Sequence, residues 1–354
     1  MEFAKLRSAA TYNLATSGVM SYPLAELPVR LNDLEINGPT IYGYAPLQER
    51  LARKNGVSPD CVVASTGTSM SNHLAMAATF EPGDEILVEE PTYELLLSTA
   101  RYLGAEIRRF PRRFEDGFRI DPAIVARHIT PRTRLIVITN LHNPSGALMD
   151  GDTLRQLGEV ALGVGARVLV DEVYMETLFD QPLPSAFHLG KHFLVTNSLT
   201  KAYGLSGLRC GWILAEPALA ERIWRLNDLF AATPAHPAEL LSVIALDNLD
   251  RIAARAKHIL DSNRRHLNAF LDSRSDLECV RPQFGTVAFP KLKNGDVDQL
   301  FTLLTSKYET SVVPGRFFEM PQHFRVGLGG AEPMTAEAFV RLGRALDDLG
   351  RGSS

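Results

Sequence analysis

The sequence predicts an α/β fold in which a large domain, built on a mainly parallel β-sheet with helices on both faces, is followed by a smaller α+β domain. Two observations predict it. Between about Val62 and Ala215, short runs dense in valine, isoleucine and leucine alternate with longer segments of helical periodicity. After Glu216 this alternation stops, and long helical segments are followed by short strand-like runs. The 354 residues, of which 45% are apolar, suffice for about two domains with a large core.

The first region is expected to contain strands wherever a short, nearly continuous apolar run occurs, as in strands buried on both faces of a parallel sheet. These strands are Val62–Ser65, Glu85–Val88, Leu135–Thr139, Arg167–Val170, Phe193–Ser198 and Cys210–Leu214. Amphipathic segments predict helices at Ser69–Thr79, Thr92–Tyr102, Asp152–Val164 and Ala218–Leu229.

The rest of the chain predicts the smaller domain. A long helical run is expected at Ala238–Leu271, with further helices near Val297–Ser306 and Thr335–Leu349 and short strands at Thr286–Phe289, Ser311–Val313 and Phe324–Gly327. We therefore divide the chain into an N-terminal segment (1–35), a large domain (36–235) and a small domain (236–354). We expect the N-terminal segment to pack on the small domain or on a neighbouring subunit.

Charge, cysteine content and hydropathy exclude several classes of function. The net charge of -4 is spread along the chain without a basic run, so no nucleic-acid partner is expected. Cys61, Cys210 and Cys279 are widely spaced, which indicates reduced thiols rather than disulfides or a zinc site, and we expect no bound metal. The N-terminus lacks the pattern of a signal peptide and no apolar run is long enough to span a membrane, so a soluble, cytoplasmic protein without a membrane partner is expected.

Lys201 follows a predicted buried strand directly, in the run Ser198-Leu199-Thr200-Lys201. An ammonium group in such a place is unfavourable unless it is paired or used chemically, and desolvation makes a lysine amine a nucleophile towards aldehydes. Arg209 follows eight residues later in a glycine-rich stretch, where its guanidinium can fork two hydrogen bonds to a phosphate. For a lone lysine, an ordinary surface position would be the simpler interpretation.

Two further motifs stand at strand ends. Asp171 follows one predicted strand, and a carboxylate there can pair with a pyridinium nitrogen, while Tyr174 can donate a hydrogen bond to a phenolate oxygen. A helix N-cap is the structural alternative for Asp171. The sequence Asn-Pro-Ser-Gly that begins at Asn143 follows another strand and predicts a turn, in which the Asn143 amide can donate to a ring oxygen.

Three other features have both a functional and a structural interpretation. The sequence Thr-Gly-Thr-Ser from Thr66 to Ser69 joins a strand to a helix. In the functional interpretation, its backbone N–H groups and hydroxyls form an anion site. In the structural interpretation, Thr68 or Ser69 merely caps the helix. Tyr93 offers an aromatic face to a flat ring, or packs in the core. Arg325 lies inside an apolar strand, where its guanidinium suits a substrate carboxylate or makes an interdomain salt bridge.

Together and in this order, the motifs resemble those of the class I and II aminotransferases, which are fold-type-I pyridoxal-phosphate enzymes. The resemblance extends from about Tyr42 to the last predicted helix. Its most specific piece is the run ending in Lys201 with Arg209, followed by the turn at Asn143 and by Asp171. The resemblance implies a seven-stranded sheet in the large domain, pyridoxal 5'-phosphate as cofactor, and a homodimer with active sites at the subunit interface.

The resemblance also implies roles for single residues. Lys201 would hold the cofactor as a Schiff base and act as general base, with Asp171 at the pyridine nitrogen and Tyr174 at the ring hydroxyl oxygen. Asn143 would also contact the ring oxygen, and Tyr93 would lie against the ring face. The phosphate would be held by Gly67, Thr68, Ser69, Ser198 and Arg209. The substrate would be bound by Arg325, Gly18 and Asn143. A tyrosine of the partner subunit would reach the phosphate, with Tyr42 as the candidate and Tyr44 as its rival.

The sequence departs from the family pattern in two places. Leu47 and the pair Arg50-Leu51 stand near Tyr42, where the family usually has a glycine and a Leu-Arg pair. The segment from Ala231 to His236 contains no arginine, so a dicarboxylate side chain would lack a counter-ion there.

We therefore hypothesise an aminotransferase that moves an amino group between an L-amino acid and a 2-oxo acid. The alternative on the same scaffold is β-elimination from a cysteine-type substrate. A non-catalytic cofactor-binding domain of a transcription regulator is more remote, because the residues before the first motif are too few for a helix-turn-helix domain.

Overall fold

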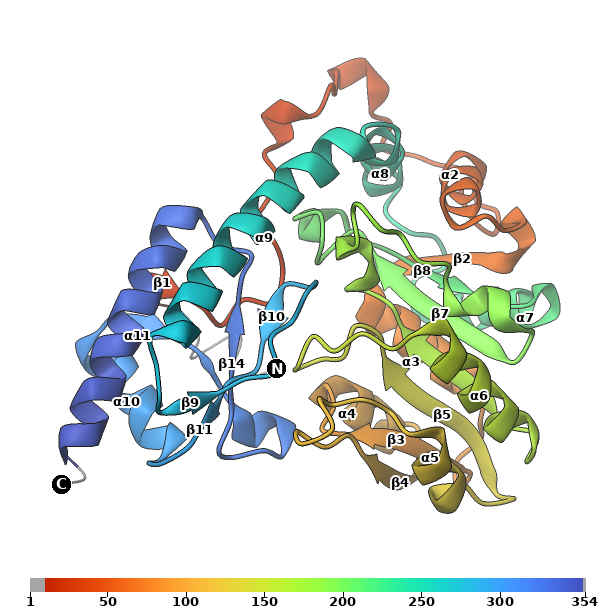
Figure 1. Ribbon diagram of the computed structural model, residues 1–354. Coiled ribbons are helices and arrows are strands. Elements are labelled where there is room, and N and C mark those ends of the chain that lie inside the picture. Colours follow the sequence, from red (N-terminus) through yellow and green to blue (C-terminus); the bar gives the residue numbers. More distant parts are fainter. Residues whose placement is uncertain (1–9, 353–354) are drawn as a thin grey trace.

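The computed structural model describes residues 10–352 and is organised around a seven-stranded sheet (Figure 1). Its strands lie in the order β2 (Val62–Thr66), β8 (Cys210–Leu214), β7 (Phe193–Ser198), β6 (Arg167–Asp171), β5 (Thr133–Thr139), β3 (Glu85–Glu90) and β4 (Glu106–Pro111). Neighbours are parallel except that β8 runs antiparallel to both β2 and β7. The predicted mainly parallel sheet is therefore confirmed. Residues 1–9 of the predicted N-terminal segment lie outside the described residues.

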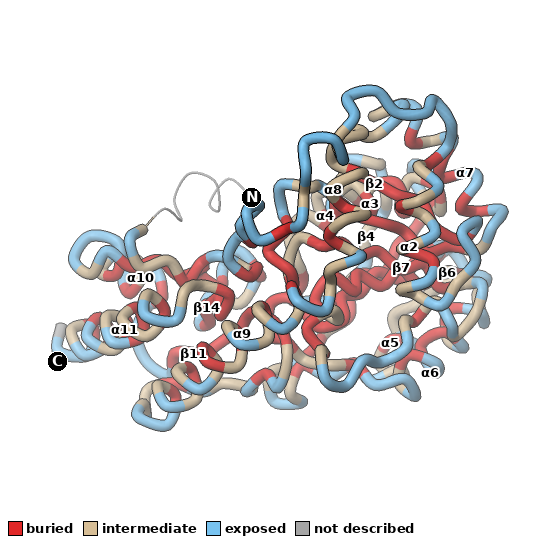
Figure 2. The backbone as a smooth tube through the Cα atoms, turned by 90° about the horizontal axis from the view of Figure 1, so that it is seen from above, coloured by how far each residue is buried: buried red, intermediate tan, exposed pale blue. Residues whose placement is uncertain are grey.

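Helices cover both faces of this sheet, each through one apolar stripe. One face carries α3 (Thr68–Ala77), α4 (Glu94–Tyr102) and α7 (Pro217–Asn227), and the other carries α5 (Pro122–His128) and α6 (Gly151–Leu162). Beside β2, α2 (Ala45–Asn55) packs against α8 (His236–Asp247) (Figure 1). The strands and the inner faces of these helices form one buried core (Figure 2).

The smaller domain contains α9 (Leu249–Asp272), α10 (Val297–Lys307) and α11 (Glu332–Gly352). Its antiparallel sheet has the order β10 (Val287–Ala288), β14 (Phe324–Gly327) and β13 (Val313–Pro314), and two strand pairs flank it: β9 (Leu277–Glu278) with β11 (Lys291–Leu292), and β1 (Tyr12–Asn13) with β12 (Thr310–Ser311). Short 3-10 helices are η1 (Leu24–Glu26), η2 (Leu31–Asp33), η3 (Pro59–Cys61), η4 (Met175–Thr177), η5 (Ala186–Leu189), η6 (Ser206–Leu208) and η7 (Gly315–Phe318).

Helix α9 connects the two cores. Ile252, near its start, packs in the core of the large sheet, whereas Ala256 and the later buried residues pack in the core of the smaller domain. Leu14 and Val19 of the N-terminal segment belong to this second core, and β1 pairs in parallel with β12. The division of the chain at residues 35 and 235 stays a prediction.

Several elements differ from the sequence-based expectation, of which β4, α2, α5 and the pair of α8 and α9 are the longest. Strand β4 was not predicted because its sequence is half polar, which an edge strand with one neighbour tolerates. Helices α2 and α5 were also not predicted, and each begins with a proline in its first turn. The single long helix expected at Ala238–Leu271 is two helices, α8 and α9, which meet at Asn248. There the Asn248 side-chain amide donates to the carbonyl oxygen of Ile244 at 2.8 Å.

His323 is a buried histidine that packs among aromatic side chains of both domains. Its ring stacks on Phe289 with 4.8 Å between centroids, and Phe114 and Phe118 approach it edge-on. Neither ring nitrogen has a hydrogen-bond partner in the described structure. Burial, with a smaller contribution from Lys291, lowers the pKa of His323 to about 4.

We predict that His323→Phe protects the protein against mild acid. Because the pKa of His323 is lower in the folded chain than in the unfolded chain, its contribution to stability is present above about pH 6.5 and is lost as the pH falls towards 4. Between about pH 7.5 and about pH 5, the variant should lose about 2 kcal/mol less unfolding free energy than the natural chain. Urea unfolding at both pH values measures this, with exposed His258→Phe as the control. If all three chains lost the same unfolding free energy between the two pH values, His323 would not be the source of the acid sensitivity.

Candidate active site

A cavity of about 190 Å³ opens at the carboxyl ends of the parallel strands, where α/β sheets place their ligands. Its lining residues are Ser17, Thr68, Ser69, Asn72, Tyr93, Thr139, Asn143, Asp171, Val173, Tyr174, Thr200, Lys201 and Arg209. Thr68, Ser69, Tyr93, Asn143, Asp171, Tyr174, Lys201 and Arg209 are residues that the sequence singled out. The fold thus brings side chains from distant positions in the chain to one place.

Asp171 ends β6 and is buried at the base of the cavity. Its Oδ2 accepts a hydrogen bond from Asn72 Nδ2 at 2.8 Å, and its Oδ1 accepts one from the Val173 backbone N–H at 3.1 Å. Thr196 Oγ1 donates to Asn72 Oδ1 at 2.6 Å, which fixes the orientation of that amide. Burial raises the pKa of Asp171 to about 6, although these hydrogen bonds and Lys201 act in the opposite direction. A cation beside Asp171 would therefore stabilise its ionised form.

Lys201 lies in the loop that follows β7, and its side chain is partly buried. Its Nζ donates a hydrogen bond to Ser17 Oγ at 2.8 Å. Gly18, the next residue, is packed against the same lysine, because a Cβ atom there would lie 3.4 to 3.5 Å from the backbone and Cδ of Lys201. The N-terminal segment therefore reaches the amine directly.

An anion-binding arrangement lies at the N-terminus of α3. Gly67 caps this helix at φ 81°, a conformation that favours glycine, and a side chain there would collide with the Arg209 guanidinium. Arg209 Nη2 donates to the carbonyl oxygen of Thr66 at 3.0 Å, and Thr68 Oγ1 donates to Ser198 Oγ at 2.8 Å. Backbone N–H groups, two hydroxyls and a guanidinium thus converge where a phosphate could bind.

Arg325 brings a positive charge from the smaller domain to Asn143, which lines the cavity. Its Nη1 donates to Asn143 Oδ1 at 3.0 Å and its Nη2 to the carbonyl oxygen of Ala15 at 3.4 Å, while its Nε is buried without a partner. Burial lowers the pKa of Arg325. No carboxylate forms an ion pair with it in the described part of the chain, so the interdomain salt bridge considered from the sequence is not what holds it. A buried guanidinium with an unused N–H group is suited to an external carboxylate.

Two tyrosines complete the wall. Tyr93 precedes α4 and Tyr174 follows β6, and both rings border the cavity. Burial raises the pKa of Tyr93, so its hydroxyl stays neutral at physiological pH.

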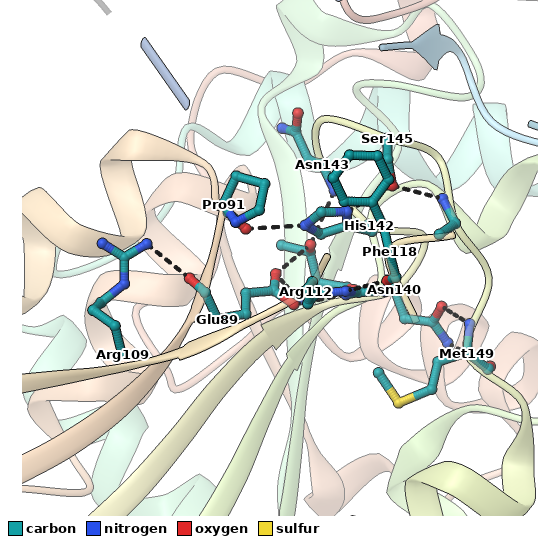
Figure 3. A network of polar contacts seen from close by, with 12 residues as sticks. Glu89, Pro91, Arg109, Arg112, Phe118, Asn140, His142, Asn143, Ser145 and Met149 are labelled. Carbon is teal, nitrogen blue, oxygen red and sulfur yellow. Dashed lines mark hydrogen bonds and ion pairs between the residues drawn. The ribbon is translucent and has the colours of Figure 1, made fainter. Parts of the chain in front are cut away.

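A buried ion pair supports the loop that carries Asn143 (Figure 3). Arg112 Nη1 donates to Glu89 Oε2 at 2.7 Å, and neither side chain is exposed to solvent. Glu89 Oε1 accepts hydrogen bonds from the backbone N–H and the hydroxyl of Thr139, at 2.8 and 2.6 Å. Thr139 Oγ1 in turn accepts from the Asn143 backbone N–H at 3.0 Å. The position of Asn143, and with it that of Arg325, therefore depends on this pair.

His142, beside Asn143, belongs to the same buried layer (Figure 3). Its Nε2 lies 3.0 Å from the carbonyl oxygen of Pro91 and its Nδ1 lies 2.6 Å from Ser145 Oγ. Because a carbonyl oxygen only accepts, Nε2 carries the proton and Ser145 donates to Nδ1. Burial lowers the pKa of His142 far below its ordinary value, so the ring is neutral and does not border the cavity.

The structure leaves five predicted residues outside this cavity wall, and two of them, Gly18 and Arg325, contact the lining residues Lys201 and Asn143. Ser198 and Gly67 contact lining residues without lining it themselves. Tyr42 is 52% exposed, and its hydroxyl donates to Asp228 Oδ2 at 2.8 Å, so it does not reach the cavity of its own chain. Its rival Tyr44 packs edge-on against His236 with 4.8 Å between ring centroids.

Sequence reasoning missed three polar residues of the site. Asn72 lies one helical turn after Thr68 and is a polar residue on the buried side of α3, which is a signal that could have been used. Thr139 ends β5, where the rule for strand ends applied equally. Ser17 carries no signal of its own, because its position depends on how the N-terminal segment crosses the domains.

Within residues 10–352, no helix is long and apolar enough to cross a membrane, and no group of three or more histidine, cysteine, aspartate or glutamate side chains could hold a metal ion.

Comparison with known proteins identifies the class. Residues 32–342 match the family model of aminotransferase class I and II. The chain is 30% identical to capreomycidine synthase of Streptomyces vinaceus, with 97% of this chain and 92% of that one covered, and 30% identical to arginine–pyruvate transaminase of Pseudomonas aeruginosa, with 86% and 79% covered. A pyridoxal-phosphate-dependent aminotransferase from Streptococcus suis superposes with a TM-score of 0.92 at 26% identity, covering 98% of this chain and 96% of that one.

The chain therefore belongs to the aminotransferase class I and II family, and its fold is that of fold-type-I pyridoxal-phosphate enzymes. It is an enzyme, a pyridoxal-phosphate-dependent aminotransferase. The residues present fit this cofactor. Asp171 is a buried carboxylate that a pyridinium would stabilise, Gly67 leaves room for the Arg209 guanidinium at the N-terminus of α3, and the amine of Lys201 borders the same cavity.

We predict that Glu89→Gln destabilises the fold strongly. The substitution leaves the buried Arg112 guanidinium without its counter-ion, which should lower the free energy of unfolding by about 3 kcal/mol. Glu106→Gln is the matched control, because Glu106 pairs with Arg132 at 2.5 Å on the solvent-exposed edge strand and its loss should cost less than about 1 kcal/mol. Urea unfolding measures both variants. Similar losses in the two would show that the buried pair does not have the role described.

Proposed function

We propose that Lys201 is the residue to which pyridoxal phosphate is attached, and that the enzyme moves an amino group between an L-amino acid and a 2-oxo acid. The observation that carries this proposal is the convergence of Lys201, Asp171, Asn143, Tyr174 and Arg209 on one cavity. When bound, the cofactor supplies a ring that accepts the electron pair released as the substrate loses its α-proton.

The residues divide into two groups around the cofactor. At one end, the N–H groups of Thr68 and Ser69, the hydroxyls of Thr68 and Ser198 and the guanidinium of Arg209 would hold the phosphate. At the other end, Asp171 would hold the pyridine nitrogen in its protonated form, with its carboxylate oriented by Asn72. Tyr174 and the Asn143 amide would donate to the ring oxygen, and Tyr93 would lie against the ring face.

Arg325 would bind the α-carboxylate of the substrate. Its buried Nε lacks a partner, and a carboxylate can take up two parallel hydrogen bonds from one guanidinium. Asn143 accepts from Arg325 through its oxygen, so its NH₂ group is left for the cavity. The amine of Lys201, once released from the cofactor, would remove the α-proton and later return it, a contribution of about 10²–10⁴-fold to the rate.

We predict that Lys201→Ala abolishes amino transfer and the yellow colour of the covalently bound cofactor. The variant keeps the phosphate-binding residues, so it should still bind the cofactor noncovalently. Visible absorption during titration with a panel of amino acids, together with a 2-oxo acid assay, measures both effects. Full activity in the variant would contradict the proposal. Ammonia released by the natural enzyme without any 2-oxo acid acceptor would instead indicate elimination chemistry.

We also propose that the enzyme is a homodimer in which Tyr42 reaches the partner's phosphate site. Residues 23–44 run along the outer edge of the molecule, beyond α8 (Figure 1), and expose large apolar side chains such as Leu31 (86% exposed) and Ile36 (85%). Leu229 and Phe230 extend this surface beside Asp228, the partner of Tyr42. Several large apolar side chains exposed on one segment are typical of an interface with another protein. We further propose that the enzyme is cytoplasmic. Its three cysteines are free thiols, which is typical of proteins in a reducing compartment.

We predict that Ile36→Asp dissociates this dimer, because it places a carboxylate in an apolar interface. Sedimentation velocity should show a dimer for the natural enzyme and a monomer for the variant. Val340→Asp is the control, since Val340 is also exposed but lies on α11 of the smaller domain. An active monomer of the natural enzyme would overturn the proposal.

A further inference from the structure

The segment Leu14–Tyr22, here called the N-terminal strap, is attached by backbone hydrogen bonds to both domains. On the smaller domain, the Gly327 N–H donates to the carbonyl oxygen of Leu14 at 2.6 Å and the Met20 N–H donates to that of Gly329 at 2.7 Å. On the large domain, the Val19 N–H donates to the carbonyl oxygen of Lys201 at 2.8 Å. The strap is therefore held in place directly beside the lysine.

Close backbone packing leaves the strap little freedom. A Cβ atom on Gly327 would collide with the carbonyl oxygen of Thr16, and one on Gly204 would collide with that of Met20. In the middle of the strap, Thr286 Oγ1 donates to the backbone oxygen of Ser17 at 2.8 Å. The backbone of Ser17 is consequently fixed beside Lys201.

Ser17 is the strap residue that lines the cavity, and its Oγ lies 2.8 Å from Lys201 Nζ. A hydroxyl oxygen accepts from an amine N–H whether the amine is neutral or protonated. If one N–H of Lys201 is held in this way, the remaining positions on Nζ, including the lone pair of the neutral amine, are left for other partners. Such a contact would orient the amine before and after it takes up a proton.

We propose that Ser17 is a positioning residue for this reaction, which holds the amino group of Lys201 while that group carries the substrate α-proton. The inference rests on the proposed function of Lys201. In the step concerned, the α-carbon–hydrogen bond breaks, its electron pair stays with the substrate, and the proton forms a new bond to Nζ. Ser17 neither gains nor loses a proton, because it accepts a hydrogen bond throughout.

The test compares Ser17→Ala with Ser17→Thr, which keeps the hydroxyl, and with Thr16→Ala, which removes an exposed hydroxyl one residue away on the same strap. In the holoenzyme, Ser17→Ala should lower kcat about tenfold with little change in KM, and it should raise the isotope effect of an α-deuterated amino acid. In the cofactor-free chain, cyanate should label Lys201 about threefold faster in Ser17→Ala, because the amine has lost its hydrogen-bond partner. Peptide mass spectrometry measures the labelling, and Ser17→Thr and Thr16→Ala should resemble the natural chain in both measurements.

The outcomes separate this inference from the proposed function. If the natural enzyme transfers amino groups but Ser17→Ala has the natural labelling rate and isotope effect, the inference on Ser17 is wrong and the function stands. If Thr16→Ala has the same effects as Ser17→Ala, the strap acts only as a structural element and the inference is also wrong. If the natural enzyme does not transfer amino groups at all, the proposed function fails and the role of Ser17 fails with it.

Discussion

The site depends on two buried charges of opposite sign, those of Asp171 and Arg325, which belong to different domains. Neither has an ion-pair partner in the described structure. Instead, each is held by amide groups: Asn72 orients Asp171, and Asn143 orients Arg325. Burial raises the pKa of Asp171 and lowers that of Arg325, so both ionised forms gain stability when a ligand brings the complementary charge. A protonated pyridine ring and a substrate carboxylate are such charges.

The same two charges explain why the site needs both domains. Arg325 reaches across from β14 to Asn143, and Asn143 is positioned by Thr139 and ultimately by the buried pair of Glu89 and Arg112. The N-terminal strap crosses from one domain to the other beside Lys201. Asp171 and Asn143, which border the cavity, are thus supported by backbone or by buried polar groups, and such support keeps reactive groups in a fixed geometry.

The sequence predicted most of the sheet and most of the cavity, because buried parallel strands are continuous apolar runs and their polar successors meet at one edge. Lys201 and Asn143 follow such strands, and Asp171 is the last residue of one. Asn72, Ser17 and the edge strand β4 could not be found in this way. Asn72 acts through a contact with β6, Ser17 through the path of the strap, and β4 lies at an edge where polar residues are tolerated. Strand patterns also say nothing about Tyr42, because the phosphate site for which it is proposed belongs to another copy of the chain.

The measurement that tests the central claim most directly is identification of the residue that binds the cofactor. Borohydride reduction of the pyridoxal-phosphate-loaded enzyme fixes the covalent link, and peptide mass spectrometry then locates it. Our account predicts that the pyridoxyl group is found on Lys201, whose amine borders the cavity beside Asp171. Attachment to another lysine, such as Lys54, or no specific attachment at all, would contradict it.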